Sequence, residues 1–130
     1  MTPLYLIAIA RTAILISGLI HIYIFYVESI TWGKPSTNKA FGIRNPADAE
    51  TTRQFAFNQG FYNLFLALGI FAGFALSRMG HSVAAETLFT FCALSIAGAG
   101  IVLFFSAKLI RPAIMQAGPP LLYLILTWFF

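Results

Sequence analysis

Four long apolar runs constrain the fold of this chain more than any other feature of its sequence. They lie at about residues 4–32, 53–76, 84–107 and 109–130 of 130. A helix that crosses the hydrocarbon core of a bilayer needs about 20 largely apolar residues, so each run is long enough. The chain is 59% hydrophobic and 9% charged, whereas about a quarter of the residues of a soluble domain are charged. The sequence therefore predicts an all-α integral membrane protein, a four-transmembrane-helix bundle that forms a single domain over residues 1–130.

The basic residues are distributed unevenly between the predicted connections. Arg78 lies alone in the second connection, whereas the first and third contain Lys34, Lys39, Arg44, Arg53, Lys108 and Arg111. Basic loops stay in the cytoplasm, which predicts that both termini are outside and that the protein is a multi-pass component of the inner (cytoplasmic) membrane. Because these residues flank apolar runs and do not interleave with aromatic residues, the net charge of +4 predicts no nucleic-acid partner.

Two ionisable residues lie within the first apolar run, in the stretch HIYIFYVE. His21 and Glu28 are seven residues apart, and a regular α-helix brings such positions to within about 20° of each other, roughly 10 Å apart along its axis. Ionisable groups are costly in hydrocarbon and usually mark function. We therefore expect His21 and Glu28 to line two levels of one cavity. The alternatives are that His21 is a structural histidine and that the Glu28 carboxylate extends into the lipid headgroups.

Further polar residues are predicted at the same depth on two other helices. The second run carries a polar stripe with helical spacing, and the fourth run carries one amide; these residues are Asn58, Gln59, Tyr62, Asn63 and Gln116. Their convergence with the first helix predicts a polar intramembrane pocket. The alternative is that each only forms a hydrogen bond with a neighbouring helix. Arg11 and Glu86 lie near the other ends of their helices, and Arg11 is expected either to form a structural ion pair with Glu86 or to extend its charged group to the membrane surface.

The segments HIYIFYVESITW, AFGI, FNQGFYNLFLALG and MQAGPPLLYLI occur in this order. In sequence and spacing they resemble a family of small four-helix membrane proteins of bacteria and fungi that is known as a domain of unknown function. The resemblance covers nearly the whole chain, and it implies a fold without implying an activity. Its most specific parts are the His-x6-Glu pair, the Asn-Gln-Gly-x-Tyr-Asn block and the Gln-x-Gly-Pro turn.

Three classes of function are compatible with this pattern. The first is binding of a lipophilic small molecule, with acid–base chemistry of the isomerase, hydratase or cyclase type. In this case His21 would be the general acid or base, because an unperturbed imidazole suits proton transfer near neutrality. Glu28 would raise or orient a charge, and the amides would position an oxygen-bearing substrate. The second is a proton-coupled transporter of small molecules or cations. The third is a structural or accessory membrane protein. One histidine and one carboxylate are too few to predict a metal site, and no cofactor is predicted. Membrane lipids and further copies of the chain, in a dimer or trimer, are the other predicted partners.

Overall fold

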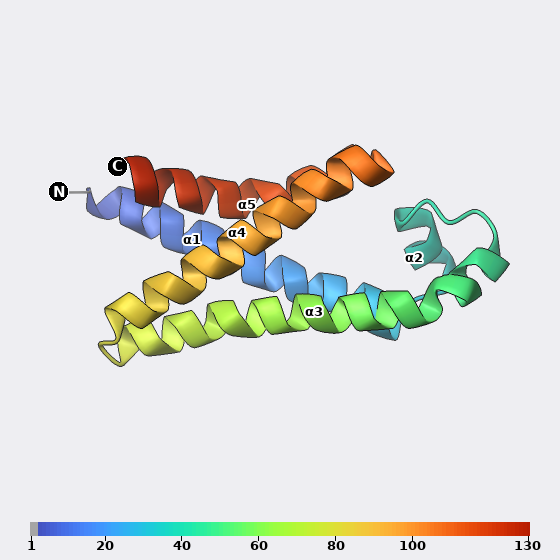
Figure 1. Cartoon of the computed structure of the whole chain (residues 1–130), viewed down its shortest axis with the longest axis horizontal. Helices are drawn as coiled ribbons and strands as arrows, with labels where there is room; N and C mark the ends of the chain where they lie inside the picture. Colours follow the sequence, from blue (N-terminus) through green and yellow to red (C-terminus); the bar gives the residue numbers. More distant parts are fainter. Residues whose placement is uncertain (1–2) are drawn as a thin grey trace. The chain divides into compact units, whose positions relative to one another are not determined.

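The computed structural model describes residues 3–130, and within them the chain forms helices and no strand (Figure 1). The prediction of an all-α fold is therefore confirmed. In chain order the elements are α1 (Leu4–Phe25), a π-helical turn (Tyr26–Ile30), α2 (Pro35–Ala40), α3 (Pro46–Arg78), α4 (Ser82–Ala107) and α5 (Ile110–Phe129).

The connection before α3 differs from the prediction. The second long helix begins at Pro46, seven residues before the predicted start at residue 53, and the short helix α2 lies in the segment that was predicted as a loop. Asn45 caps α3, since its Oδ1 accepts a hydrogen bond from the backbone N–H of Ala47 at 3.0 Å. Pro46 suits the first helical position. These local signals start the helix before its apolar run begins, so the apolar run alone placed the boundary too late.

Three helical stretches are long and apolar enough to cross a membrane: Leu4–Ile30, Pro46–Arg78 and Ser82–Ala107. Large apolar side chains such as Leu19, Phe91 and Val102 remain exposed along them, as expected for contact with lipid. These features indicate a multi-pass membrane protein. The helix α5 has 20 residues, but Arg111, Gln116 and three prolines lower its apolar content. A fourth span therefore stays a prediction.

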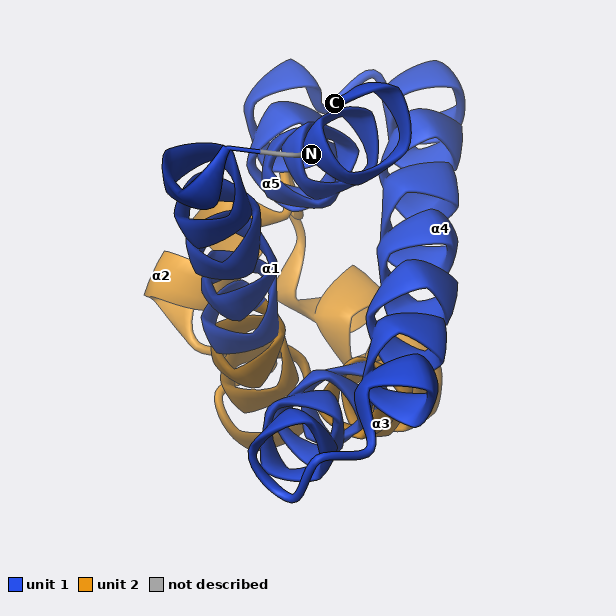
Figure 2. Ribbon diagram, turned by 90° about the vertical axis from the view of Figure 1, so that its left-hand side faces the viewer, with its two compact units in different colours: residues 1–20, 66–130 blue, residues 21–65 orange. Residues whose placement is uncertain are grey.

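The chain divides into two compact units (Figure 2). The first comprises Met1–Ile20 and Leu66–Phe130, and the second comprises His21–Phe65. The prediction of a single domain stays a prediction. The core of the first unit is built from buried side chains that include Ile14, Ile70, Phe89, Ile96 and Tyr123.

Small residues let α4 and α5 approach closely in the first unit. A Cβ atom placed on Gly100 would lie 2.7 Å from the Cβ of Ala117 and 3.0 Å from its backbone nitrogen. Only glycine fits such a contact, which is the usual way in which membrane helices bring their backbones together. The helix α5 runs unbroken through Pro119 and Pro120, although proline inside a helix commonly kinks or breaks it.

A charged cluster joins three helices of the first unit. Arg11 of α1 forms an ion pair with Glu86 of α4, and the hydroxyl of Tyr123 on α5 donates a hydrogen bond to Glu86 Oε2 at 2.9 Å. The guanidinium carbon of Arg11 also lies 4.5 Å from the centroid of the Phe89 ring, within range of a cation–π interaction. The predicted Arg11–Glu86 pair is confirmed, and Tyr123 is a third member that the sequence did not reveal.

Candidate functional site

Glu28 lies in a π-helical turn, Tyr26–Ile30, that directly continues α1. The N–H of Thr31 donates to the carbonyl of Tyr26 at 3.1 Å, which is the i→i+5 bond of a π-helix. A π turn holds more residues than an α turn, so side chains beyond Phe25 are rotated away from their positions on a straight α-helix. Because the π turn follows Phe25, His21 and Glu28 are not separated by two regular α-helical turns, and a shared face for them stays a prediction. Single π turns often occur at functional sites.

The helix α3 contacts this turn at Gly60. A Cβ atom on Gly60 would lie 2.1 Å from Ser29 Oγ, 3.1 Å from Glu28 Cβ and 3.2 Å from the carbonyl oxygen of Phe25. Real Cβ atoms do not approach other atoms as closely as the first of these distances, so any added side chain would displace the Ser29 hydroxyl and crowd Glu28 Cβ and the Phe25 carbonyl. Ser29 Oγ also donates a hydrogen bond to the carbonyl of Phe57 at 3.0 Å. Because Gly60 has no side chain, the polar stripe of α3 can lie directly against Glu28.

Glu28 and Asn63 form the central polar contact of the second unit. Asn63 Nδ2 donates to Glu28 Oε2 at 2.8 Å and to the carbonyl of Gln59 at 3.0 Å. Both side chains are buried, with Glu28 9% exposed and Asn63 4% exposed. An amide nitrogen has two hydrogens to donate, so both are used and the amide is fixed with its donor group toward the carboxyl.

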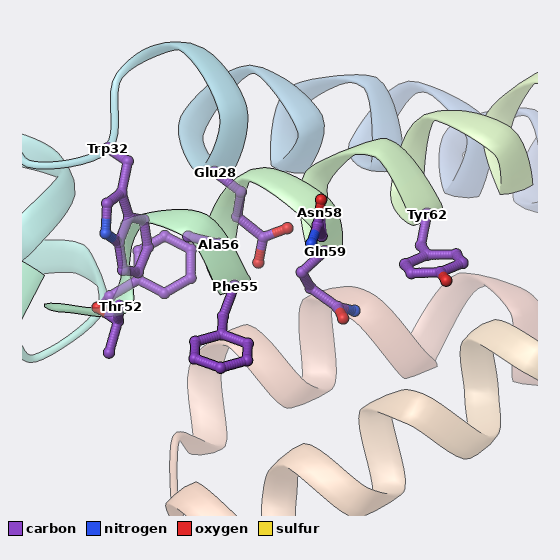
Figure 3. Close-up of a pocket in the computed structure, with 9 residues that line it drawn as sticks. Glu28, Trp32, Thr52, Phe55, Ala56, Asn58, Gln59 and Tyr62 are labelled. Carbon is purple, nitrogen blue, oxygen red and sulfur yellow. The ribbon is translucent and has the colours of Figure 1, made fainter. Parts of the chain in front are cut away.

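A pocket of about 520 Å³ opens beside this contact. Figure 3 shows the Glu28 carboxyl group projecting from its helix toward the pocket, on the side where Phe55 and Gln59 lie. Of the described residues that line the pocket, Glu28 is the one acidic or basic residue. The lining consists of Glu28, Trp32, Phe41, Thr52, Phe55, Ala56, Asn58, Gln59 and Tyr62.

One wall of the pocket is fixed by contacts around Trp32. The indole Nε1 donates to the carbonyl of Ala49 at 2.8 Å, and the Trp32 ring packs edge-on against Phe41 with 5.0 Å between centroids. The Trp32 carbonyl accepts a hydrogen bond from Arg53 Nη1 at 3.3 Å, and Arg53 is also paired with Glu50. These bonds tie the segment after the π turn to the start of α3 and hold the Trp32 ring in place.

The structure brings most of the predicted site residues together in the second unit. Asn63 bonds to the Glu28 carboxyl, and the other residues of the polar stripe line the pocket with Glu28; these are Asn58, Gln59 and Tyr62. His21 is in the same unit and is fully buried, but it is not among the lining residues. Gln116 belongs to the first unit, where it is half-buried in α5. The functional roles of all seven residues stay predictions.

Sequence reasoning missed the aromatic wall and the threonine of the pocket. Trp32 resembled a membrane-interface aromatic, and Phe41, Thr52 and Phe55 carried no recognisable pattern. Gly33 was an available signal, because a glycine directly after Trp32 indicates a turn. In the structure its φ is +88°, and a Cβ atom there would lie 3.0 Å from Arg53 Nη2. Among residues 3–130, no group of three or more His, Cys, Asp or Glu side chains is placed to hold a metal ion.

Comparison with known proteins finds a match to a protein family. No curated protein and no solved structure matches the chain. The family match runs from residue 15 to residue 128 and therefore includes every residue of the pocket. It confirms the resemblance to a family of unknown function. Because the match spans most of the chain, the protein belongs to the family described as "Protein of unknown function (DUF1304)".

Proposed function

We propose that the pocket beside Glu28 binds a lipophilic small molecule within the membrane. The observation that carries this proposal is a buried carboxyl group, hydrogen-bonded to Asn63, that lines an open and largely apolar pocket. Ionisable residues in membrane-spanning helices are costly and generally mark a functional site. A volume of about 520 Å³ is in the range of small-molecule sites, which combine an apolar lining with a few placed polar groups.

The two kinds of lining residue have different roles in this proposal. Phe55, Trp32 and Phe41 contact the apolar body of the ligand, and Glu28 binds its polar group. The side chains of Asn58 and Gln59 are exposed, so they are available for further hydrogen bonds at the edge of the pocket. A carboxyl group beside a bound polar atom can also give or take a proton. In any isomerisation, hydration or cyclisation of the ligand, Glu28 would therefore be the group that transfers the proton.

Glu28→Gln is expected to remove the ligand while leaving the fold intact. Glutamine has nearly the same shape, and its Oε1 can still accept the hydrogen bond from Asn63. Binding of a polar group to the carboxylate is lost, and hydrogen bonds to charged groups contribute about 1.5–3 kcal/mol, or roughly tenfold or more in affinity. Native mass spectrometry of the purified protein in nanodiscs measures the fraction that carries a bound small molecule.

Asp48→Asn is the matched control. Asp48 belongs to the same unit, is exposed and does not line the pocket, and removing a negative charge from the first turn of α3 costs at most about 1 kcal/mol. The variant should therefore keep its ligand. Equal occupancy in Glu28→Gln and in the unaltered protein would contradict the proposed site.

We also propose four transmembrane helices with both termini outside, in the cytoplasmic membrane. The support is the excess of basic residues in the first and third connections over the second. The helix α5 is the proposed fourth span: its 20 residues cover about 30 Å at 1.5 Å per residue, which is the thickness of a hydrocarbon core.

Cysteine labelling tests this topology. In a Cys92→Ala background, Ser36→Cys and Ser82→Cys place single thiols at exposed positions in the first and second connections. A membrane-impermeant maleimide added to intact cells should label Ser82→Cys and should label Ser36→Cys only after the cells are opened. The reverse pattern would show that the orientation is inverted, and labelling of both from outside would rule out the predicted span between them.

A further inference from the structure

The Glu28 carboxyl group has no cationic partner in the pocket wall. Its recorded hydrogen bond comes from the neutral amide of Asn63, and the described lining contains no lysine, arginine or histidine. An ionised carboxylate removed from water is costly unless an opposite charge or several hydrogen bonds compensate it. A ligand that supplies a positive charge would provide that compensation.

Two hydrogen-bond donors of the pocket wall are used within the protein. The Trp32 indole N–H donates to Ala49, and the Thr52 hydroxyl donates to the carbonyl of Asp48 at 2.7 Å. Both hydrogens on Asn63 Nδ2, behind Glu28, are also donated. The side chains of Asn58, Gln59 and Tyr62 also line the pocket, and each can donate as well as accept a hydrogen bond. The acidic group of Glu28 is therefore what favours a cationic ligand over an anionic one.

Four aromatic side chains surround the same space. Trp32, Phe41, Phe55 and Tyr62 all line the pocket, and Figure 3 shows the rings of Phe55 and Tyr62 on either side of Gln59 along α3. Aromatic faces attract cations, most strongly where water is excluded, and they also contact apolar chains. A carboxylate with aromatic walls suits a molecule that is cationic at one end and apolar at the other.

We infer that the pocket binds a lipophilic amine in its protonated form, with the ammonium group at Glu28 and the apolar chain along the aromatic wall. This inference rests on the proposed function, since it names the class of ligand for the same pocket. The ammonium N–H groups would donate to the Glu28 carboxylate, and the Asn58 and Gln59 side-chain carbonyls would accept further hydrogen bonds.

Three probes with one alkyl chain and different head groups test this inference. They are dodecylammonium, 1-dodecanol and dodecanoate, added to the full chain in phosphatidylcholine nanodiscs. The protein has two tryptophans, so Trp128→Phe leaves Trp32, which lines the pocket, as the only tryptophan. Its fluorescence then reports occupancy of the pocket, and empty nanodiscs correct for partitioning into lipid.

We expect saturable binding of dodecylammonium at least tenfold tighter than that of dodecanol, and no saturable signal with dodecanoate. Glu28→Gln should weaken dodecylammonium at least tenfold and change dodecanol less than threefold. Glu28→Asp keeps the charge and should keep the preference for the amine, so it serves as a second test if Glu28→Gln fails to fold.

The alternative results separate the two levels of the proposal. If the amine and the alcohol bind equally well, and Glu28→Gln weakens both equally, the pocket binds lipophilic molecules as proposed but does not prefer a cation. This result would overturn the inference. Tighter binding of dodecanoate than of dodecylammonium would likewise overturn the inference that the ligand is a cation. Saturable binding of none of the three probes would overturn the inference, while the native mass spectra of unaltered protein and Glu28→Gln would decide the proposed function separately.

Discussion

Gly60→Val is expected to lower the free energy of unfolding by about 2–4 kcal/mol and to abolish ligand binding. The added Cβ atom would displace Ser29 Oγ from its bond to Phe57 and would lie 3.1 Å from Glu28 Cβ and 3.2 Å from the Phe25 carbonyl oxygen. The two methyl groups of valine add to this crowding, so we expect α3 and the π turn to move apart. Overpacking costs about 1–3 kcal/mol, and loss of the Ser29–Phe57 hydrogen bond adds about 1 kcal/mol. Unfolding in mixed micelles with increasing SDS, followed by circular dichroism, measures the change in stability.

Gly98→Val is the control for this substitution. Gly98 is also helical, and no atom lies within 4 Å of a Cβ atom built on it. Glycine and valine differ in helix propensity by only a few tenths of a kcal/mol, so Gly98→Val should change stability by less than about 0.5 kcal/mol, as is usual for sites without special contacts. Similar losses of stability in both variants would show that the close contact at Gly60 is not what stabilises the second unit.

The apolar runs predicted the long helices well because length and composition determine what can cross a bilayer. The features that escaped prediction depend on contacts between segments distant in sequence. The π turn at Tyr26–Ile30 has no periodic signal in the sequence, and it faces Gly60, more than thirty residues later in the chain. The early start of α3 at Pro46 is an exception, because Asn45 and Pro46 encode it locally, in polar first turns that lie outside the apolar run.

The candidate site was predictable where helical spacing alone decides which residues meet. The i,i+4 spacing placed Asn58 with Tyr62 and Gln59 with Asn63 on one broad stripe, and this stripe faces Glu28 in the second unit. The aromatic wall was not predictable, because a phenylalanine or tryptophan in a membrane helix most often contacts lipid. Trp32 joins the pocket through its bond to Ala49, a contact that depends on how the segment after the π turn folds back.

The Arg11–Glu86 pair should be far more sensitive to removal of one partner than to removal of both. Among residues 3–130, Glu86 is the acidic partner recorded for Arg11, so Glu86→Leu leaves a cation with only the Phe89 ring beside it. Breaking a buried pair costs about 3–5 kcal/mol. The Arg11 and Glu86 side chains here are 29% and 42% exposed, and we therefore expect a smaller loss of about 2–3 kcal/mol in the free energy of unfolding.

Arg11→Met should cost less than Glu86→Leu, because Glu86 keeps the hydrogen bond from the Tyr123 hydroxyl. The double variant should recover to within about 1 kcal/mol of the unaltered protein, since replacing both charges by apolar side chains removes the desolvation cost of both. SDS unfolding of all four proteins gives the coupling free energy between the two sites directly. A double variant as unstable as Glu86→Leu would mean that the cost comes from lost packing around Tyr123 and Phe89, and that an unpaired arginine is tolerated at this depth.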